Sequence, residues 1–256
     1  MTSQVVLERT ANKMRSLPWS RFAAVLVDPC GSVESVVRRP DFAGTMFAAI
    51  ALFLAFGAAT LPRQLSVLHL ALAPTGVSAV DGHYAAMQGG LTRLIIADRL
   101  VPSPTVLLAG IVLVLLAEPV LALARDRRAT LLTLAVLGLA PLLVQQIGEC
   151  IMTYTANIAP DPAPGRAIEL ANRFQTGPLL FWSSEARAPA WIEILSARVN
   201  LVSLWCVGLW ALGLRVMDGK RFRVWHIGMP VVSLAVAGIV TWILGPMVLA
   251  AVLGRP

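Results

Sequence analysis

The sequence predicts an all-α, polytopic membrane protein with five transmembrane helices plus short amphipathic interfacial helices. Three observations support this fold class. Of the 256 residues, 57% are hydrophobic and only 14% are charged, and the mean hydropathy is +0.74; soluble domains are about 25% charged. Several apolar runs approach the roughly 20 residues that a helix needs to cross a bilayer. The 17 prolines and 19 glycines are typical of helices separated by irregular connections and exclude a simple coiled coil.

Five apolar segments are predicted to span the membrane. No signal peptide precedes the first of them, so we expect it to stay in the mature protein as an anchor. The predicted spans are residues 42–61, 105–124, 131–152, 194–216 and 227–253. They form one membrane domain, 42–253, with long outer connections at 62–104 and 153–193. The first connection is expected to hold an interfacial helix near Met87–Val101, with a re-entrant segment as the alternative.

The N-terminal tail, residues 1–41, is predicted to contain two short interfacial helices. Trp19–Val27 is apolar apart from one arginine and is interrupted by Asp28-Pro29. A second helix is expected to begin with Ser32 as its N-cap. It should end before Pro40, because proline disfavours helix in the residue that precedes it. Aromatic and basic side chains on such segments suit the lipid headgroup layer, and packing against the ends of the spans is the alternative.

The distribution of basic residues predicts the orientation in the membrane. The tail and the short connections at 125–130 and 215–226 carry thirteen of the 21 arginines and lysines, and the rest of the chain carries eight. Because cytoplasmic loops are enriched in Lys and Arg, we expect the N-terminus in the cytoplasm and the C-terminus outside. The net charge of +7 is then a topology signal, and nucleic-acid binding is not expected.

Polar side chains within the predicted spans form two candidate sites, because such groups are costly in lipid. Glu118 either serves a proton or ion path or pairs with Arg125 or Arg215. A second group lies toward the outer ends of the third and fourth spans, where Glu149 is predicted to face Arg198. This group either holds helices together or lines a polar pocket. Its members are Gln145, Gln146, Glu149, Arg198 and Asn200.

The first, fourth and fifth spans carry candidate residues for contact with other helices. Ala51, Ala55 and Ala59 recur at the small-xxx-small spacing that lets a second helix approach closely, and the alternative is that they face this protein's own bundle. The bulky side chains expected to fill an interface or anchor in lipid are Trp205, Trp210 and Trp242.

Sequence patterns of catalysis are not found. The chain contains no GxSxG, HExxH or GxxxxGK[ST] motif. Its three histidines lack metal-ligand spacing, and its three cysteines are far apart, as apolar fillers would be. We therefore do not expect an enzyme, and no cofactor or metal is predicted.

The fourth span and its flanks carry a family resemblance. Asn200–Trp205, Gly208–Arg215, a short basic turn and a fifth apolar helix resemble the C-terminal half of the bacterial Yip family, the Ypt-interacting proteins with the Yip-one domain. The approach to the first span, with Asp28-Pro29 and Arg39-Pro40, is similar to the family's N-terminal region.

This resemblance implies five spans, a cytoplasmic N-terminus and a non-enzymatic role exerted through other membrane proteins. The protein is then expected to be an accessory or scaffold subunit of a larger membrane assembly, such as an ABC-type exporter. The acidic-Leu-Tyr-Gly-Pro and Gly-Tyr motifs of eukaryotic members are missing, so a Rab-type GTPase partner is not expected. The alternative is a small-solute or ion transporter that uses Glu118 and the Gln145–Asn200 polar group.

Overall fold

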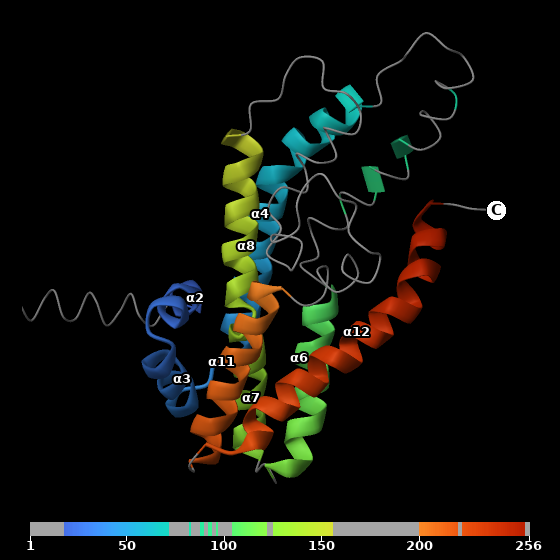
Figure 1. Ribbon diagram of the computed structural model, residues 1–256. Coiled ribbons are helices and arrows are strands. Elements are labelled where there is room, and N and C mark those ends of the chain that lie inside the picture. The colour runs from blue at the N-terminus through green and yellow to red at the C-terminus, as the bar shows by residue number, and fades with distance from the viewer. Residues whose placement is uncertain are drawn as a thin grey trace, which may run out of the picture. The chain divides into compact units, whose positions relative to one another are not determined.

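The computed structural model describes residues 18–71, 104–121, 125–155, 200–219 and 222–253, together with a few isolated positions between 82 and 96. These residues are almost entirely helical and include no strand, which confirms the predicted all-α class. The helices, shown in Figure 1, are α2 (Pro18–Val27), α3 (Pro29–Arg38), α4 (Phe42–Ala71), α6 (Pro104–Val120), α7 (Arg125–Leu137), α8 (Ala140–Thr155), α11 (Leu201–Asp218) and α12 (Val224–Leu253).

Four helical segments of the described chain are long and apolar enough to cross a membrane, as an integral membrane protein requires. They are Phe42–Ser66, Arg127–Thr155, Leu201–Asp218 and Val224–Leu244. The remaining predicted span corresponds to α6, an apolar helix of 17 residues. At 1.5 Å per residue α6 rises about 26 Å, slightly less than the ~30 Å of hydrocarbon. The second predicted span, 105–124, and with it the total of five, therefore stays a prediction, and residues 194–199 of the predicted fourth span lie outside the described residues.

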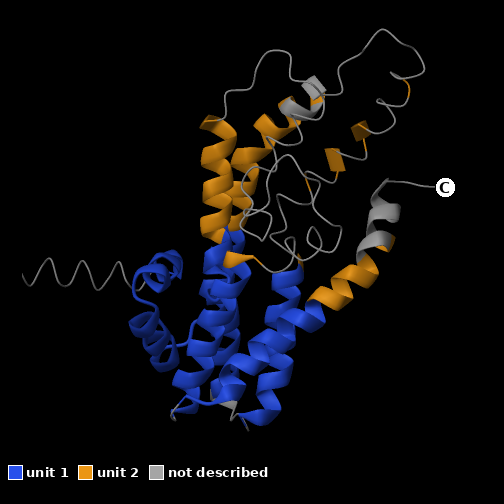
Figure 2. Ribbon diagram, in the orientation of Figure 1, with its two compact units in different colours: residues 1–52, 105–142, 202–237 blue, residues 53–104, 143–201, 238–256 orange. Residues whose placement is uncertain are grey.

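The chain divides into two compact units (Figure 2). Unit 1 comprises residues 1–52, 105–142 and 202–237, and unit 2 comprises residues 53–104, 143–201 and 238–256. Unit 1 thus holds α2, α3, α6, α7 and most of α11, whereas α4, α8 and α12 contribute residues to both units. Residues 62–71 of the first predicted connection belong to α4, which continues through Pro62, and residues 153–155 of the second belong to α8. The rest of both connections, including the helix expected near Met87–Val101, falls largely outside the described residues.

The tail forms the two predicted helices, α2 and α3, which pack on each other and on α7. The prediction that α3 begins after Ser32 is wrong. Asp28 is the N-cap and its side chain accepts a hydrogen bond from the Gly31 N–H at 3.0 Å, with Pro29 in the first turn. Both residues are typical of a helix start. The aspartate side chain accepts a hydrogen bond from an otherwise unpaired N–H. Proline has no N–H, and in the first turn of a helix none is required. Asp41 accepts from the Gly44 N–H in the same way at the start of α4.

The core of unit 1 surrounds α7. Every residue from Thr130 to Leu142 is buried except Leu132, which is half-buried. A helix that is apolar on all sides is expected at the centre of a bundle, and α7 occupies that position within unit 1. The helix is interrupted at Gly138-Leu139, just before Pro141 in the first turn of α8. Proline cannot donate the helical hydrogen bond and crowds the carbonyl four residues earlier, which explains the break.

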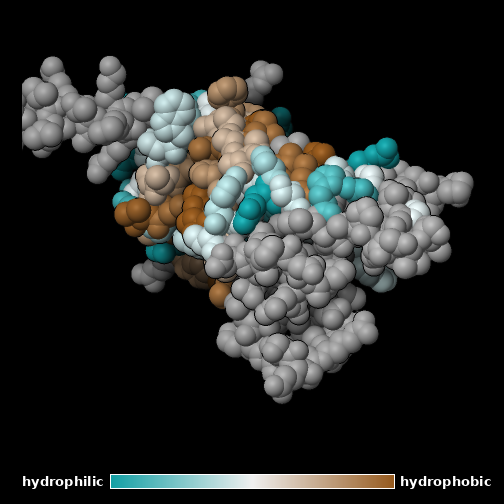
Figure 3. Space-filling model, turned by 90° about the horizontal axis from the view of Figure 1, so that it is seen from above, coloured by the Kyte–Doolittle hydropathy of each residue, from teal (hydrophilic) through white to brown (hydrophobic). Residues whose placement is uncertain are grey.

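Helix α12 and the outer face of α4 differ from α7 in their exposure. Only 17% of the most apolar part of Val224–Leu244 is buried, and 28% of that of Phe42–Ser66, against 67% for Arg127–Thr155. Figure 3 shows tan and brown apolar side chains over a large part of the described surface seen from above. In a membrane protein such faces meet lipid or the helices of other proteins.

Candidate membrane-embedded sites

Glu118 lies near the end of α6 and forms an ion pair with Arg128 in the first turns of α7. The predicted partners were Arg125, whose side chain lies outside the described part of the chain, and Arg215, which is not the arginine that the structure pairs with Glu118; pairing near the ends of the helices was foreseen. Both side chains are partly exposed. The arginine neutralises the carboxylate, as expected for an acidic group in a span.

The polar group of α8 is partly assembled in unit 2. The Gln145 side chain donates a hydrogen bond to Glu149 Oε1 at 2.9 Å, one helical turn away. Gln146 Oε1 is buried and has no hydrogen-bond partner among the described residues. Asn200 directly precedes α11, and Arg198 lies outside the described residues, so the pairing of Glu149 with Arg198 stays a prediction. Glu118 belongs to unit 1.

The three alanines of the predicted contact surface are all exposed on α4. Ala51, Ala55 and Ala59 line one side of the helix, and the large side chains exposed around them are Phe47, Ile50 and Leu54. The opposite side is buried and includes Phe53 and Thr60. In unit 2 the Tyr154 hydroxyl donates to the Ala59 carbonyl at 2.6 Å, which ties α8 to the edge of this surface. The alternative that all three alanines face this protein's own bundle is not what the described residues show.

The three predicted interface tryptophans have different environments. Trp205 and Trp242 are 42% and 58% exposed, in keeping with an interface or with lipid. Trp210 is only 1% exposed, so its assignment to an intermolecular interface is wrong. It is one of the largest fully buried side chains in the described chain and belongs to the core of unit 1.

Trp210 joins α11 to α6 and α7. Its indole Nε1–H donates to the Ala135 carbonyl at 3.0 Å. Next to it, the Leu139 N–H donates to the Val136 carbonyl, three residues back, which leaves the Ala135 carbonyl available to the indole. The ring lies directly over Gly138, where an added Cβ would overlap indole atoms, and Cζ2 would stand 3.6 Å from a Cβ on Gly110 of α6. The indole ring of Trp210 therefore packs against the helix break that follows α7 and against the two glycines.

This arrangement was missed by the sequence reasoning, although two local signals point to it. Gly138 and Pro141 stand within an apolar run, where each interrupts a helix and exposes backbone carbonyls. A buried tryptophan needs an acceptor for its N–H. The pattern indicates that such an acceptor exists in the bundle, but not that α11 supplies the tryptophan.

A second unforeseen contact closes the turn between α11 and α12. His226 is fully buried. Its Nδ1 accepts from the Arg223 backbone N–H at 2.9 Å, so Nε2 carries the ring proton, and Nε2 lies 3.4 Å from Asp218 Oδ2. Gly219 makes the intervening turn with φ of 63°. The described residues contain no group of histidine, cysteine and carboxylate side chains that could hold a metal ion.

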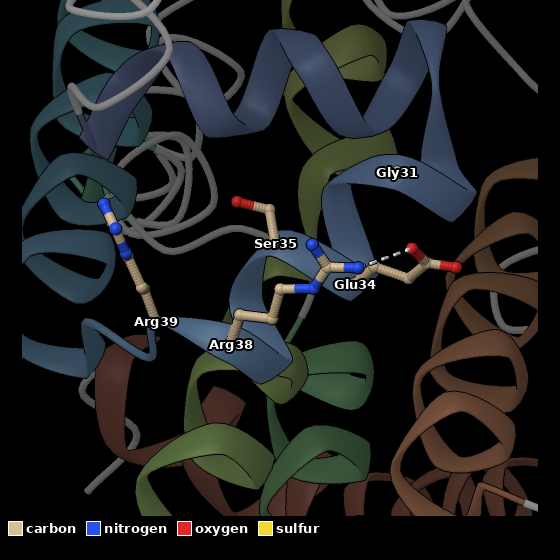
Figure 4. A pocket seen from close by; sticks show the side chains of 5 residues that line it. All are labelled: Gly31, Glu34, Ser35, Arg38 and Arg39. Carbon is tan, nitrogen blue, oxygen red and sulfur yellow. Dashed lines mark ion pairs between the residues drawn. The ribbon is translucent and has the colours of Figure 1, made fainter.

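A pocket of about 310 Å³ lies beside α3, lined by Gly31, Glu34, Ser35, Arg38 and Arg39. Figure 4 shows Arg38 turned toward Glu34, with which it forms an ion pair at 3.7 Å, while Arg39 points away from that pair. Because the two guanidinium groups do not converge and one is already paired, this pocket is a weak site for an anion.

The described helices define a class, that of all-helical, multi-pass membrane proteins, and comparison with known proteins adds nothing narrower. No family model, no curated protein and no solved structure that we compared with the chain matches it.

Proposed function

We propose that the protein is a non-enzymatic accessory or scaffold subunit that binds other integral membrane proteins laterally, through the outer face of α4. The observation that carries this proposal is the exposure of Ala51, Ala55 and Ala59 on one side of a helix in which the opposite side is buried. The partner is a transmembrane helix of another protein.

The physical argument concerns what makes two helices associate in lipid. Lipid tails are as apolar as leucine, so apolar composition does not drive association, and close backbone approach over small residues does. The three alanines extend over two turns of α4 and offer such an approach. The larger Phe47, Ile50 and Leu54 beside them are exposed and available to pack around a partner.

Further support comes from two polar side chains that a transporter would use, because each is already bonded to another side chain of this protein. Glu118 is held by Arg128, and Gln145 is bonded to Glu149 on the same helix. The resemblance of Asn200–Arg215 and the following helix to the Yip family agrees with a role exerted through partners, and family membership is part of this proposal. So are five spans, the bacterial inner membrane and a cytoplasmic N-terminus.

The experiment compares two alanine-to-leucine substitutions. Ala55→Leu enlarges the proposed contact surface, and Ala235→Leu makes the same change at an exposed position of α12. Affinity-tagged protein is purified from its native membrane in mild detergent, and stoichiometric membrane partners are quantified. We expect Ala55→Leu to lose the partners and Ala235→Leu to retain them, with both variants folded and inserted.

Two results would contradict the proposal. One is that both variants retain or lose the same partners. The other is solute flux by the purified protein alone in proteoliposomes, abolished by Glu118→Gln, which would replace a scaffold with a transporter.

A further inference from the structure

A groove runs along the exposed side of α11 in unit 1, separate from the α4 surface. It encloses about 310 Å³. The residues that matter for its chemistry are Leu204, Gly208, Leu212 and Arg215 of α11, Phe222 of the turn and Ile227 of α12. Its volume is at the lower end of the range of small-molecule sites in proteins.

The middle of the groove is open because Gly208 has no side chain. Gly208 is exposed, and a Cβ added there would meet no atom within 4 Å. One helical turn to either side, Leu204 and Leu212 form apolar walls, and the buried Val207 and Ala211 lie beneath. Glycine favours a helix less than alanine does, and here it leaves room on an apolar helix surface.

One end of the groove is charged. Arg215 is exposed and lies in the last turn of α11, three residues before the helix ends at Asp218. The connection that follows adds Lys220, Arg221 and Arg223 to the sequence. The end of a spanning helix lies at the membrane surface, so Arg215 stands where lipid headgroups are found.

The length of the groove matches one leaflet. From Arg215 to Leu204 the helix rises about 16 Å at 1.5 Å per residue. Half of the ~30 Å hydrocarbon core is about 15 Å. An acyl chain in the groove would therefore extend from the surface to about the middle of the bilayer.

We propose that this groove binds one anionic phospholipid, with the headgroup phosphate at Arg215 and one acyl chain over Gly208 between Leu204 and Leu212. Charge complementarity selects the headgroup, because among the described residues that line the groove the charged side chain is an arginine. The apolar walls distinguish a lipid from free phosphate. This site is independent of the α4 surface, so either proposal can fail without the other.

The test measures lipid binding to the full-length protein. Delipidated protein in detergent is titrated with phosphatidylglycerol or phosphatidylcholine of identical chains, and bound lipids are counted by native mass spectrometry. Arg215→Gln removes the phosphate partner and Gly208→Leu fills the groove. The matched controls are Arg223→Gln, an exposed arginine outside the groove, and Ala235→Leu on α12.

We expect the wild-type protein to bind one phosphatidylglycerol in preference to phosphatidylcholine. Arg215→Gln should lower the affinity for phosphatidylglycerol about fivefold, as expected for one basic side chain near an anionic membrane, and should abolish the preference. Gly208→Leu should abolish binding of both lipids without lowering the thermal midpoint, because its Cβ meets open space. Both controls should bind as the wild type does, and millimolar inorganic phosphate should not compete.

Several results would overturn the proposal. Equal affinity of the wild type for the two lipids would exclude headgroup selection. Equal losses in Arg215→Gln and Arg223→Gln would indicate diffuse charge attraction. If the folded Gly208→Leu variant retained lipid, the groove would be excluded as the lipid-binding site. The same conclusion would follow if a helix of another protein were cross-linked to position 208.

Discussion

The inner face of α11 and the outer face of α4 are both apolar helix surfaces, yet one is buried and the other is not. On α11, Trp210 is fully buried against Gly138 and bonded to the Ala135 carbonyl. On α4, Ala51 and Ala55 have the small size that permits close contact, but they are exposed. The difference shows that apolar composition does not decide which helix faces pair in this chain.

Pairing of α11 with its neighbours combines small residues with one polar group. Gly138 and Gly110 let the indole ring approach the backbone, and a carbonyl at the break in α7 accepts its N–H. Hydrogen bonds between transmembrane helices contribute about 0.6–2 kcal/mol each. The face of α4 offers the small residues alone, which fits a surface completed by another protein.

The largest effect should come from removing the tryptophan. Trp210→Ala leaves a cavity in the core of unit 1 and frees the Ala135 carbonyl, so we expect a loss of about 3 kcal/mol in the free energy of unfolding. Thermal or denaturant unfolding in detergent measures it. Trp205→Ala, at a tryptophan that is 42% exposed, should cost less than half as much. Equal losses would remove the distinction between the buried and exposed faces of α11.

A smaller effect is expected at Gly138, which packs against the indole ring of Trp210. Gly138→Ala places a Cβ against buried ring atoms and should cost about 1–3 kcal/mol through overpacking. Gly110→Ala is the matched control, because its Cβ would stand at an ordinary 3.6 Å from the ring. It should be neutral or slightly stabilising, since alanine favours helix. In a Trp210→Ala background the cost of Gly138→Ala should disappear, and a persistent cost would show that the clash lies elsewhere.

The spans were predicted from the sequence more completely than the contacts between helices. Four of the five predicted spans correspond to helices long enough to cross a membrane, because an apolar run of about 20 residues is a local signal. The start of α3 was placed wrongly because Ser32 and Asp28 are both acceptable caps, and the choice depends on Pro29 occupying the first turn.

The contacts between helices were predicted less well. Exposure of Ala51, Ala55 and Ala59 agrees with the predicted contact surface, whereas Trp210 was assigned to the wrong environment. A tryptophan in a span suits a core, an interface or lipid equally well. The choice depends on a free carbonyl 75 residues earlier in the chain, and no periodicity within one helix reports such a contact.

The smallest effect concerns the tail. Asp28→Ala removes the side-chain acceptor of the Gly31 N–H and should cost about 1 kcal/mol. Asp41→Ala removes the equivalent bond at α4, a helix of 30 residues against 10 in α3. Fraying of one turn matters less in a long packed helix. We therefore expect Asp41→Ala to lower the free energy of unfolding less than Asp28→Ala does. Hydrogen exchange of the first turn of each helix would measure both, and stronger protection of α3 than of α4 after substitution would contradict the expectation.

The most direct test of lateral binding by α4 is site-specific photo-cross-linking in the native membrane. A photoreactive benzophenone amino acid is introduced at Ala55, and in a second variant at Ala235 on the exposed face of α12. Lateral binding by α4 predicts discrete adducts with another membrane protein at position 55 and none at position 235. The same adducts from both positions, or none from position 55 in a folded and inserted protein, would contradict it.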